Sequence, residues 1–334
     1  MPLDSKIGIT DLSYKMTRRC MAEIAYYGQN QASFHAGSQM IEKTMRMFVN
    51  EETVREVTEQ VGKTIYEEET QKAKHSFENM AKMETAEHLK QTTLYIMTDG
   101  AAVNTRIEDA KGSTWRENKT VMVFTDRNLI KRKDGSHIIT KKEYAAFIGS
   151  AEDFKKYVWN LAVRNGYGKV SRVVMIADGA TWIRNMCKEL FPDAVQILDL
   201  YHLKENVYTY AKHKFKQDAS KYTPWAESVN SRLENGRYEE VISSLPEGEK
   251  LPANVVNLRT YLENNMEKID YPAYKKQGFF VGSGAIESAN KIILQRRLKQ
   301  SGMRWSVNGA QYVLSLRCKV ESGQWDMVAQ RFCA

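Results

Sequence analysis

The stretch from Ser171 to His202 constrains the fold of this chain more than any other. It begins with a short apolar, β-branched run, Val173 to Ala177, which is long enough for a buried strand and too short for a helix. Asp178 ends this run, a helical pattern follows, and a second apolar run, Val195 to Leu198, leads to Asp199. Because α/β sheets place their chemistry at the carboxyl ends of strands, the stretch predicts an α/β fold with acidic residues at that edge.

Two more acidic residues occupy comparable positions. Asp99 follows an upstream apolar run, residues 94–98, and Glu287 follows the glycine-rich turn at Gly282 to Gly284. Taken singly, each acid is equally explained as a helix cap or a turn residue, since Asp-Gly is a common turn. In this order, on these elements, Asp99, Asp178 and Glu287 together indicate a catalytic set.

Five ordered motifs carry a resemblance to a known family. They are DGAAVNTR (99–106), ADGATWI (177–183), ILDLYHLKEN (197–206), GSGAIESANK (282–291) and RRLKQSGMRWSVNGAQYVLSLR (296–317). Through these motifs the chain resembles the DDE transposases of bacterial insertion sequences, specifically the ISKra type, close to the Mutator-like group. The resemblance covers roughly residues 30–328. It implies an enzyme that binds transposon ends, cleaves DNA and joins the 3′-ends to a target.

The predicted elements follow the order of a ribonuclease H-like fold. Strands are expected at 93–98, 121–126 and 137–140, helices over 141–165, and further strands at 173–177 and 195–198. This order, βββαβαβα, gives a mixed sheet flanked by helices, with three antiparallel strands extended by parallel ones. It places the ends of the first and fourth strands side by side. Asp99 and Asp178 are therefore expected to be neighbours, although 178 − 99 = 79 positions separate them.

The N-terminal residues 1–90 are predicted to be helical. Ser33 and Asn50 are expected to cap two helices joined by a short turn. The pair is either a helix-turn-helix DNA-binding region or an ordinary helical hairpin, because the second helix is acidic and would face phosphates poorly. The expected apolar positions are Phe34, Met40, Ile41, Met45 and Phe48 on the first helix, and Val54, Val57, Val61 and Ile65 on the second.

Three further segments complete the predicted organisation. Residues 91–215 form the first part of the catalytic core, and 278–334 form its last part, with the Glu287 helix and a basic C-terminal segment. Between them, 216–277 are interpreted as an α-helical insertion, and a separate helical domain is the alternative. The return of matching motifs after this segment favours the insertion.

The three acids suit metal-dependent phosphoryl transfer. Cleavage of a phosphodiester builds negative charge that two Mg²⁺ ions, about 3.5–4 Å apart, can stabilise while activating the nucleophile. Mg²⁺ prefers carboxylate oxygens and keeps several waters. We therefore expect Asp99 to bridge both ions, with Asp178 and Glu287 each completing one side, and Mn²⁺ to substitute for Mg²⁺.

Asp199 and His202 form a second candidate pair. The resemblance implies a C/D-x-x-H signature near the active site, which here reads Asp199-Leu200-Tyr201-His202. Residues three apart at a helix start share a face, so the pair could orient a phosphate, a base or the carboxylates. The alternative is a structural histidine bonded to Asp199.

The segment after Glu287 is basic and is the candidate DNA-binding surface. Its cations, Lys291, Arg296, Arg297, Lys299 and Arg304, are expected to flank the metal site where the DNA backbone lies. Trp182 and Trp305 are candidates to stack on an unpaired base. In the alternatives, the cations only solvate a helix face and the tryptophans belong to the core.

Composition limits the remaining classes. The formal net charge is +8, from 49 Lys and Arg against 41 Asp and Glu, which suits nucleic acid but also an ordinary basic protein. Four scattered cysteines argue against a disulfide framework or zinc knuckle and for a reducing compartment. With no signal peptide or apolar span, we expect a bacterial, cytoplasmic, nucleoid-associated protein with no membrane partner.

The resulting hypothesis is a DDE transposase that acts with Mg²⁺ on double-stranded DNA, both transposon ends and target. We expect it to work as a homo-oligomer on DNA. The alternatives are a domesticated or truncated derivative that binds DNA without transposing, and a metal-dependent nuclease of the same fold.

Overall fold

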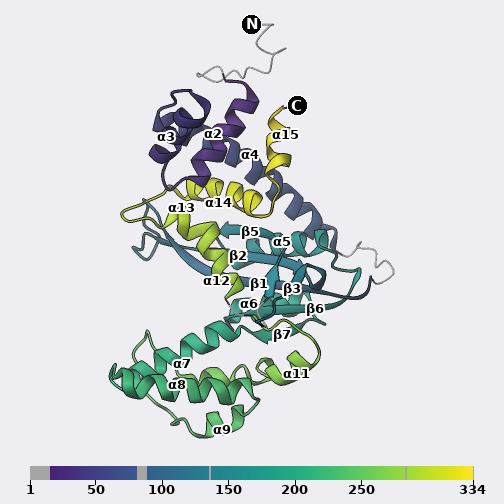
Figure 1. Ribbon diagram of the computed structural model, residues 1–334, viewed down its shortest axis with the longest axis vertical. Coiled ribbons are helices and arrows are strands. Elements are labelled where there is room, and N and C mark those ends of the chain that lie inside the picture. The colour runs from purple at the N-terminus through teal and green to yellow at the C-terminus, as the bar shows by residue number, and fades with distance from the viewer. Residues whose placement is uncertain (1–15, 81–88, 135–136, 283, 334) are drawn as a thin grey trace. The chain divides into compact units, whose positions relative to one another are not determined.

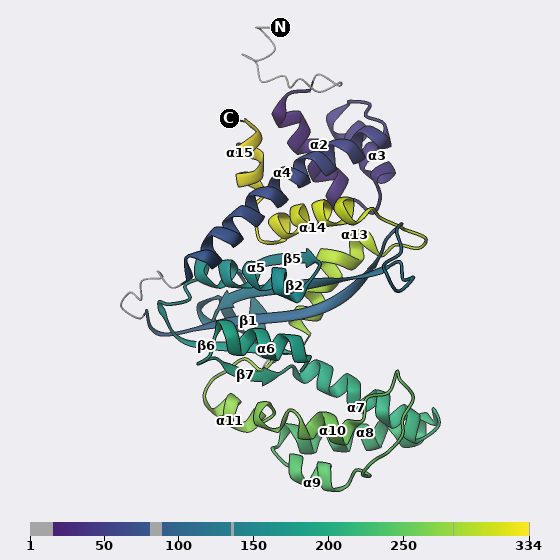
Figure 2. The same cartoon turned by 180° about the vertical axis from the view of Figure 1, so that it is seen from behind.

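The structure is a computed structural model that describes residues 16–80, 89–134, 137–282 and 284–333 (Figures 1 and 2). The chain forms two compact units. Unit 1 comprises Met1–Leu94, Thr98–Ser171 and Ile286–Ala334, and unit 2 comprises Tyr95–Met97 and Arg172–Ala285.

A five-stranded mixed sheet with the order β5-β2-β1-β6-β7 forms the centre of the fold. Its strands are β1 (Leu89–Asn104), β2 (Trp115–Thr125), β5 (Glu143–Ile148), β6 (Val170–Ala177) and β7 (Val195–Leu198). β2 and β5 pair antiparallel, whereas β6 and β7 pair parallel. Helices α5 (Ala151–Arg164) and α6 (Thr181–Leu190) follow β5 and β6 along the chain. This order confirms the predicted ribonuclease H-like sheet.

One helix prediction was wrong, and one predicted strand lies outside the main sheet. The segment Glu143–Ile148 was expected to be helical because its aromatic residues are three apart, but it is strand β5. Its residues alternate between half-buried and buried, which is the pattern of a strand against a core. The strand expected at 137–140 is β4 (His137–Ile139), which pairs with β3 (Leu129–Lys131) in a separate two-stranded ladder.

The first strand is also longer than predicted. It was expected to end at residue 98, but β1 continues to Asn104, so Asp99 and Gly100 lie inside the strand. The Asp-Gly pair therefore makes no turn here. Hydrogen bonding to neighbouring strands keeps the backbone extended.

The N- and C-terminal helices of unit 1 share one apolar core. They are α2 (Arg18–Asn30), α3 (Phe34–Met45), α4 (Glu51–Glu78), α14 (Val307–Glu321) and α15 (Trp325–Cys333). The stripe predicted on α4, Val54 to Ile65, is buried in this core together with Leu316 and Val328. One face of the long helix α4 is thus covered by α2 and α14. Whether α3 and α4 contact DNA stays a prediction.

The caps predicted for α3 and α4 are confirmed, but one apolar position is wrong. Ser33 accepts a hydrogen bond from the Ala36 N–H, and Asn50 accepts one from the Thr53 N–H. Helix α3 ends at Met45 because the next residue adopts the left-handed conformation (φ 55°). Phe48 therefore lies beyond the helix and is 77% exposed.

Unit 2 contains the helices predicted over 216–277, and whether these form an insertion or a separate domain stays a prediction. It contains α7 (Leu200–Lys214), α8 (Ala219–Glu234), α9 (Tyr238–Ser243), α10 (Leu258–Glu263), the short turn η3 (Met266–Lys268) and α11 (Tyr271–Lys276). Helices α7 and α8 pack against each other, and α9 and α10 contact them (Figure 2). Among the described helices, none is long and apolar enough to cross a bilayer.

Candidate active site

Asp99 is held in a fixed orientation within β1. The residue is 8% exposed, and its Oδ1 accepts a hydrogen bond of 2.7 Å from the Gly100 N–H. Its Oδ2 accepts a second bond of 2.7 Å from the side-chain amide of Asn290. These hydrogen bonds fix the direction of the Asp99 carboxylate.

Asn290 links Asp99 to Glu287 within unit 1. Both Asn290 and Glu287 lie on α12 (Ala285–Asn290), three residues apart and therefore on the same helical face. The Asn290 hydrogen bond thus connects Asp99 to the helix that carries Glu287, although 287 − 99 = 188 positions separate the two acids. A π-helical segment, η4 (Lys291–Gln295), follows α12 directly, and such segments recur at functional sites.

Glu117 and Lys119 on β2 form a charged pair, and Glu117 lies close to Gly100 of β1. An added Cβ on Gly100 would lie 2.7 Å from Oε1 of Glu117, so the Glu117 carboxylate lies close to Gly100. Glu117 pairs with Lys119 at 2.6 Å, and Lys119 also donates to the Gly149 carbonyl at 2.8 Å. A further carboxylate therefore approaches β1 beside Asp99.

Asp178 lies directly after β6 in unit 2. Its Oδ1 accepts a hydrogen bond of 2.8 Å from the Ala180 N–H, which turns the chain into α6. Its main-chain carbonyl accepts a bond of 2.9 Å from the hydroxyl of Tyr261. Burial raises the pKa of Tyr261, and the nearby carboxylates of Asp178 and Asp199 raise it further, so this hydroxyl remains a donor. That Asp99 and Asp178 are neighbours stays a prediction.

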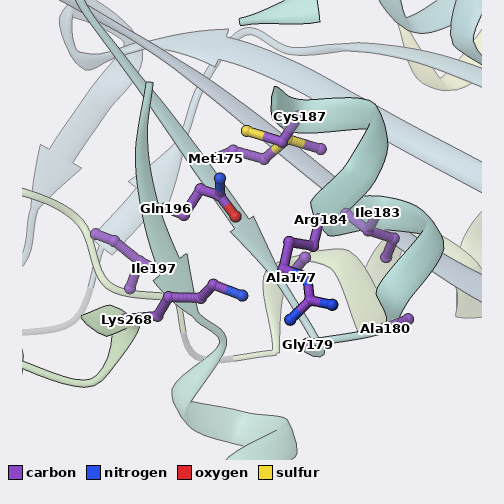
Figure 3. A pocket seen from close by; sticks show the side chains of 10 residues that line it. All are labelled: Met175, Ala177, Gly179, Ala180, Ile183, Arg184, Cys187, Gln196, Ile197 and Lys268. Atoms are coloured by element: carbon purple, nitrogen blue, oxygen red, sulfur yellow. The ribbon is translucent and has the colours of Figure 1, made fainter. Parts of the chain in front are cut away.

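A small pocket next to Asp178 is lined by two cationic side chains. The residues flanking Asp178 line it, and Arg184 and Lys268 point into it from α6 and η3 (Figure 3). Its volume of about 20 Å³ suits one or two waters. Burial lowers the pKa of Lys268, and the neighbouring cations Arg184 and Lys188 lower it further.

Asp199 is fully buried and caps α7. Its Oδ1 accepts from the Tyr201 N–H at 2.8 Å, and its own N–H donates to the Ala177 carbonyl at 2.8 Å. An added Cβ on Gly282, which has φ +81°, would lie 3.2 Å from Asp199 Oδ1. Gly282 therefore lies close to the Asp199 side chain. His202, in the first turn of α7, is half-buried, with Nδ1 3.7 Å from a Glu205 carboxylate oxygen.

The basic segment divides into exposed and buried residues. Lys291, Arg296, Lys299 and Arg304 are exposed, as a DNA-contacting set requires. Arg297 is 1% exposed and Trp305 is 7% exposed, and the two contact each other in the interior of unit 1. Arg297 and Trp305 therefore do not lie on the outer surface with the other cations, and whether the two residues contact DNA stays a prediction. Trp182 is half-buried at the start of α6.

The donor chemistry around Asp99 fits a hydrated hard cation. Within the described ranges, no three carboxylate, imidazole or thiol groups already form a metal-sized cluster. However, Oδ1 of Asn290 is buried and meets no hydrogen-bond donor among the described residues. This oxygen could accept from a metal-bound water, and Mg²⁺ usually keeps several waters beside one or two carboxylates.

The sequence motifs did not single out several of the residues that make these contacts. Glu117, Tyr261, Arg184 and Lys268 lie outside the five motifs, whereas Asn290 lies within GSGAIESANK. A signal existed only for Asn290, which stands one helical turn after Glu287 on a predicted helix start.

Residues 20–330 match the Uncharacterised protein family (UPF0236). The match covers most of the chain, including every acid and every basic residue discussed above. The chain belongs to UPF0236. No curated protein matches this UPF0236 chain.

Proposed function

We propose that this UPF0236 protein is a transposase of the DDE type that binds transposon ends, cleaves DNA and transfers 3′-OH strands to a target. One observation carries the proposal. Asn290 holds the carboxylate of Asp99 while Glu287 stands one turn earlier on the same helix. Asn290, 191 positions from Asp99 in the chain, thereby ties Asp99 to the helix that carries Glu287.

The strand order and the sequence motifs also support a transposase of the DDE type. The strand order β5-β2-β1-β6-β7 places β1 and β6, which carry Asp99 and lead to Asp178, next to each other in the sheet. The motif resemblance to the ISKra type then assigns Asp99, Asp178 and Glu287 as the DDE triad. Two acids on adjacent strands and one on a later helix are the arrangement such chemistry uses.

We propose that these three acids hold two Mg²⁺ ions, with Mn²⁺ able to replace them. When bound, the ions activate the attacking oxygen and stabilise the leaving oxygen of the phosphodiester. The chain's own contribution is positional. The Gly100 N–H and the Asn290 amide fix Asp99 before substrate arrives, so little reorganisation is needed in the transition state.

Asp199 and His202 act beside the triad in this proposal. Asp199 joins the start of α7 to the last residue of β6, and so fixes the backbone next to Asp178. It is a positioning residue. His202 projects from the first turn of α7 and would orient a phosphate or base.

DNA would lie along exposed cations. Lys291, Arg296, Lys299 and Arg304 follow Glu287 without an intervening acid, and Arg184 and Lys268 add charge near Asp178. Phosphate contacts of this kind position a duplex without reading its sequence. Trp182 remains a candidate to stack on an unpaired base, and a homo-oligomer on DNA in the bacterial nucleoid fits this work.

The proposal is tested by incubating the protein with a supercoiled plasmid that carries its element ends, with Mg²⁺ or with a chelator. Double-strand cleavage and joining only with Mg²⁺ would support a transposase. Cleavage without joining would support a nuclease, and binding without cleavage would support a DNA-binding derivative.

A further inference from the structure

Unit 1 contains a strongly cationic cavity of about 200 Å³. Four arginines line it, Arg55, Arg106, Arg297 and Arg304, against one carboxylate, Glu59. Glu59 already pairs with Arg55 at 3.2 Å, so the remaining positive charge is not balanced within the lining.

Arg297 is the buried centre of this cavity wall. Its guanidinium lies between the rings of Phe34 and Trp305, 4.3 and 4.9 Å from their centroids. Its Nε donates to the Gly28 carbonyl at 3.0 Å, whereas Nη2 is buried and meets no acceptor in the described part of the chain. An unsatisfied N–H on a buried cation is costly, and an anion in the cavity would remove that cost.

Burial and, to a smaller extent, the nearby Arg317 lower the pKa of Arg297 to about 9. The lowered pKa means that the surroundings of Arg297 disfavour its positive charge. A negatively charged ligand would reverse this effect.

Two helices begin at the cavity. Ser33 and Ser306, the N-caps of α3 and α14, both line it. Helix N-termini carry partial positive charge and unpaired N–H groups, and they commonly bind phosphate. Arg297, which also lines the cavity, adds a cation to these helix ends.

The remaining lining is apolar and aromatic. Met303, Phe34 and Trp305 form it, and the volume corresponds to on the order of ten water positions. That space exceeds what a phosphate alone would fill. It suits a phosphate joined to a planar organic group.

We infer that this cavity binds a nucleotide, with its phosphate against Arg297 and its base on the apolar lining. The same chemistry is presented by a free mononucleotide and by an unpaired nucleotide in DNA. Arg106 follows Asp99 by seven residues and lies two residues beyond the end of β1, so the two residues are at most about 23 Å apart at 3.3 Å per residue. In the DNA case, which rests on the proposed function, the captured nucleotide would lie up to about seven positions from the cleaved bond, at 3.4 Å each.

The first test is calorimetric titration with deoxyadenosine 5′-monophosphate and with deoxyadenosine, which lacks the phosphate. We expect the monophosphate to bind at least tenfold more tightly. Arg304→Gln, an exposed position that should not disturb folding, and Arg297→Met should each weaken that binding at least tenfold. Arg127→Ala, an exposed arginine of unit 1 outside the cavity, should leave it within twofold. Thermal unfolding checks that each variant is folded.

The second test compares a fully paired transposon end with one carrying three unpaired nucleotides centred seven positions from the cleaved bond. Tighter binding to the unpaired form that is lost in Arg304→Gln identifies DNA as the source. Monophosphate binding without this preference identifies a free nucleotide. The inference is overturned if neither ligand distinguishes wild type from Arg304→Gln. Failure of wild type to cleave paired ends with Mg²⁺ would instead refute the proposed function and leave monophosphate binding unaffected.

Discussion

The side-chain amide of Asn290 donates a 2.7 Å hydrogen bond to Oδ2 of Asp99, and Asn290 is itself only 2% exposed. Because Asn290 and Glu287 share a helical face, this one bond couples strand β1 to the helix that carries the last predicted acid. Asn290 should therefore behave as a positioning residue for Asp99.

Asn290→Ala should lower DNA cleavage by about ten- to a hundredfold, since Asp99 loses one of its two orienting donors. It should also lower the free energy of unfolding by about 1–3 kcal/mol, because a buried acceptor loses its partner. Cleavage kinetics and urea unfolding measure the two effects. Asn308→Ala, an exposed position on α14, is the control. Equal loss of binding and cleavage would show that Asn290 acts only through stability.

His202→Ala should reduce cleavage at least tenfold while the melting temperature changes little, because the ring is half-buried on the first turn of α7. Glu205→Gln removes the carboxylate 3.7 Å from His202 and should leave cleavage nearly unchanged. Single-turnover cleavage and thermal melts distinguish a role of His202 in cleavage from a structural role. A His202 variant that cleaves normally and only melts earlier would establish a structural histidine.

Arg296→Ala combined with Lys299→Ala should weaken binding to every DNA sequence. Each lost phosphate contact lowers the slope of log K against log salt by close to one, so the slope should fall by about one to two. Binding isotherms at several salt concentrations measure it. Arg127→Ala with Lys131→Ala removes the same charge from another exposed region and serves as the control. An unchanged slope in the Arg296 and Lys299 variant would mean that these residues only solvate their helix.

The positive charge of Arg297 should contribute little to the free energy of unfolding. Arg297→Met keeps apolar contact with the Phe34 and Trp305 rings and removes an incompletely satisfied cation, so the free energy of unfolding should stay within about 1 kcal/mol or rise. Arg297→Ala leaves a void and should cost about 2–4 kcal/mol. Denaturant unfolding of both variants tests this. A loss of several kcal/mol in Arg297→Met would show that the charge itself stabilises the core.

Elements with a strong local pattern were predictable. Strand β7 has the predicted bounds, Val195–Leu198, and the caps of α3 and α4 are as expected, because apolar runs and Ser or Asn caps are local signals. Strand β5 was not predictable in this way. The spacing of Tyr144 and Phe147 matches a helix, and only pairing with β2 decides for a strand.

The three acidic residues of the candidate site could be predicted from the sequence, but the residues that contact them could not. Strand ends and glycine turns mark Asp99, Asp178 and Glu287 in the sequence. The burial of Arg297 depends on Phe34, which is 297 − 34 = 263 positions away. Nothing in the local run of arginines distinguishes Arg297 from exposed Arg296. Contacts between distant segments cannot be inferred from a local pattern.

The central claim is that Asp99, Asp178 and Glu287 act as one metal-dependent site. The most direct measurement is cleavage and joining of the element-end plasmid with Mg²⁺ by Asp99→Asn, Asp178→Asn, Glu287→Gln and their pairs. Asp193→Asn, an exposed acid beyond α6, is the matched control. We predict that each single variant loses at least about a thousandfold in rate, that pairs lose no more than singles, and that binding to the ends changes less than threefold. Full activity in Asp178→Asn, or losses that simply multiply in the pairs, would contradict the claim.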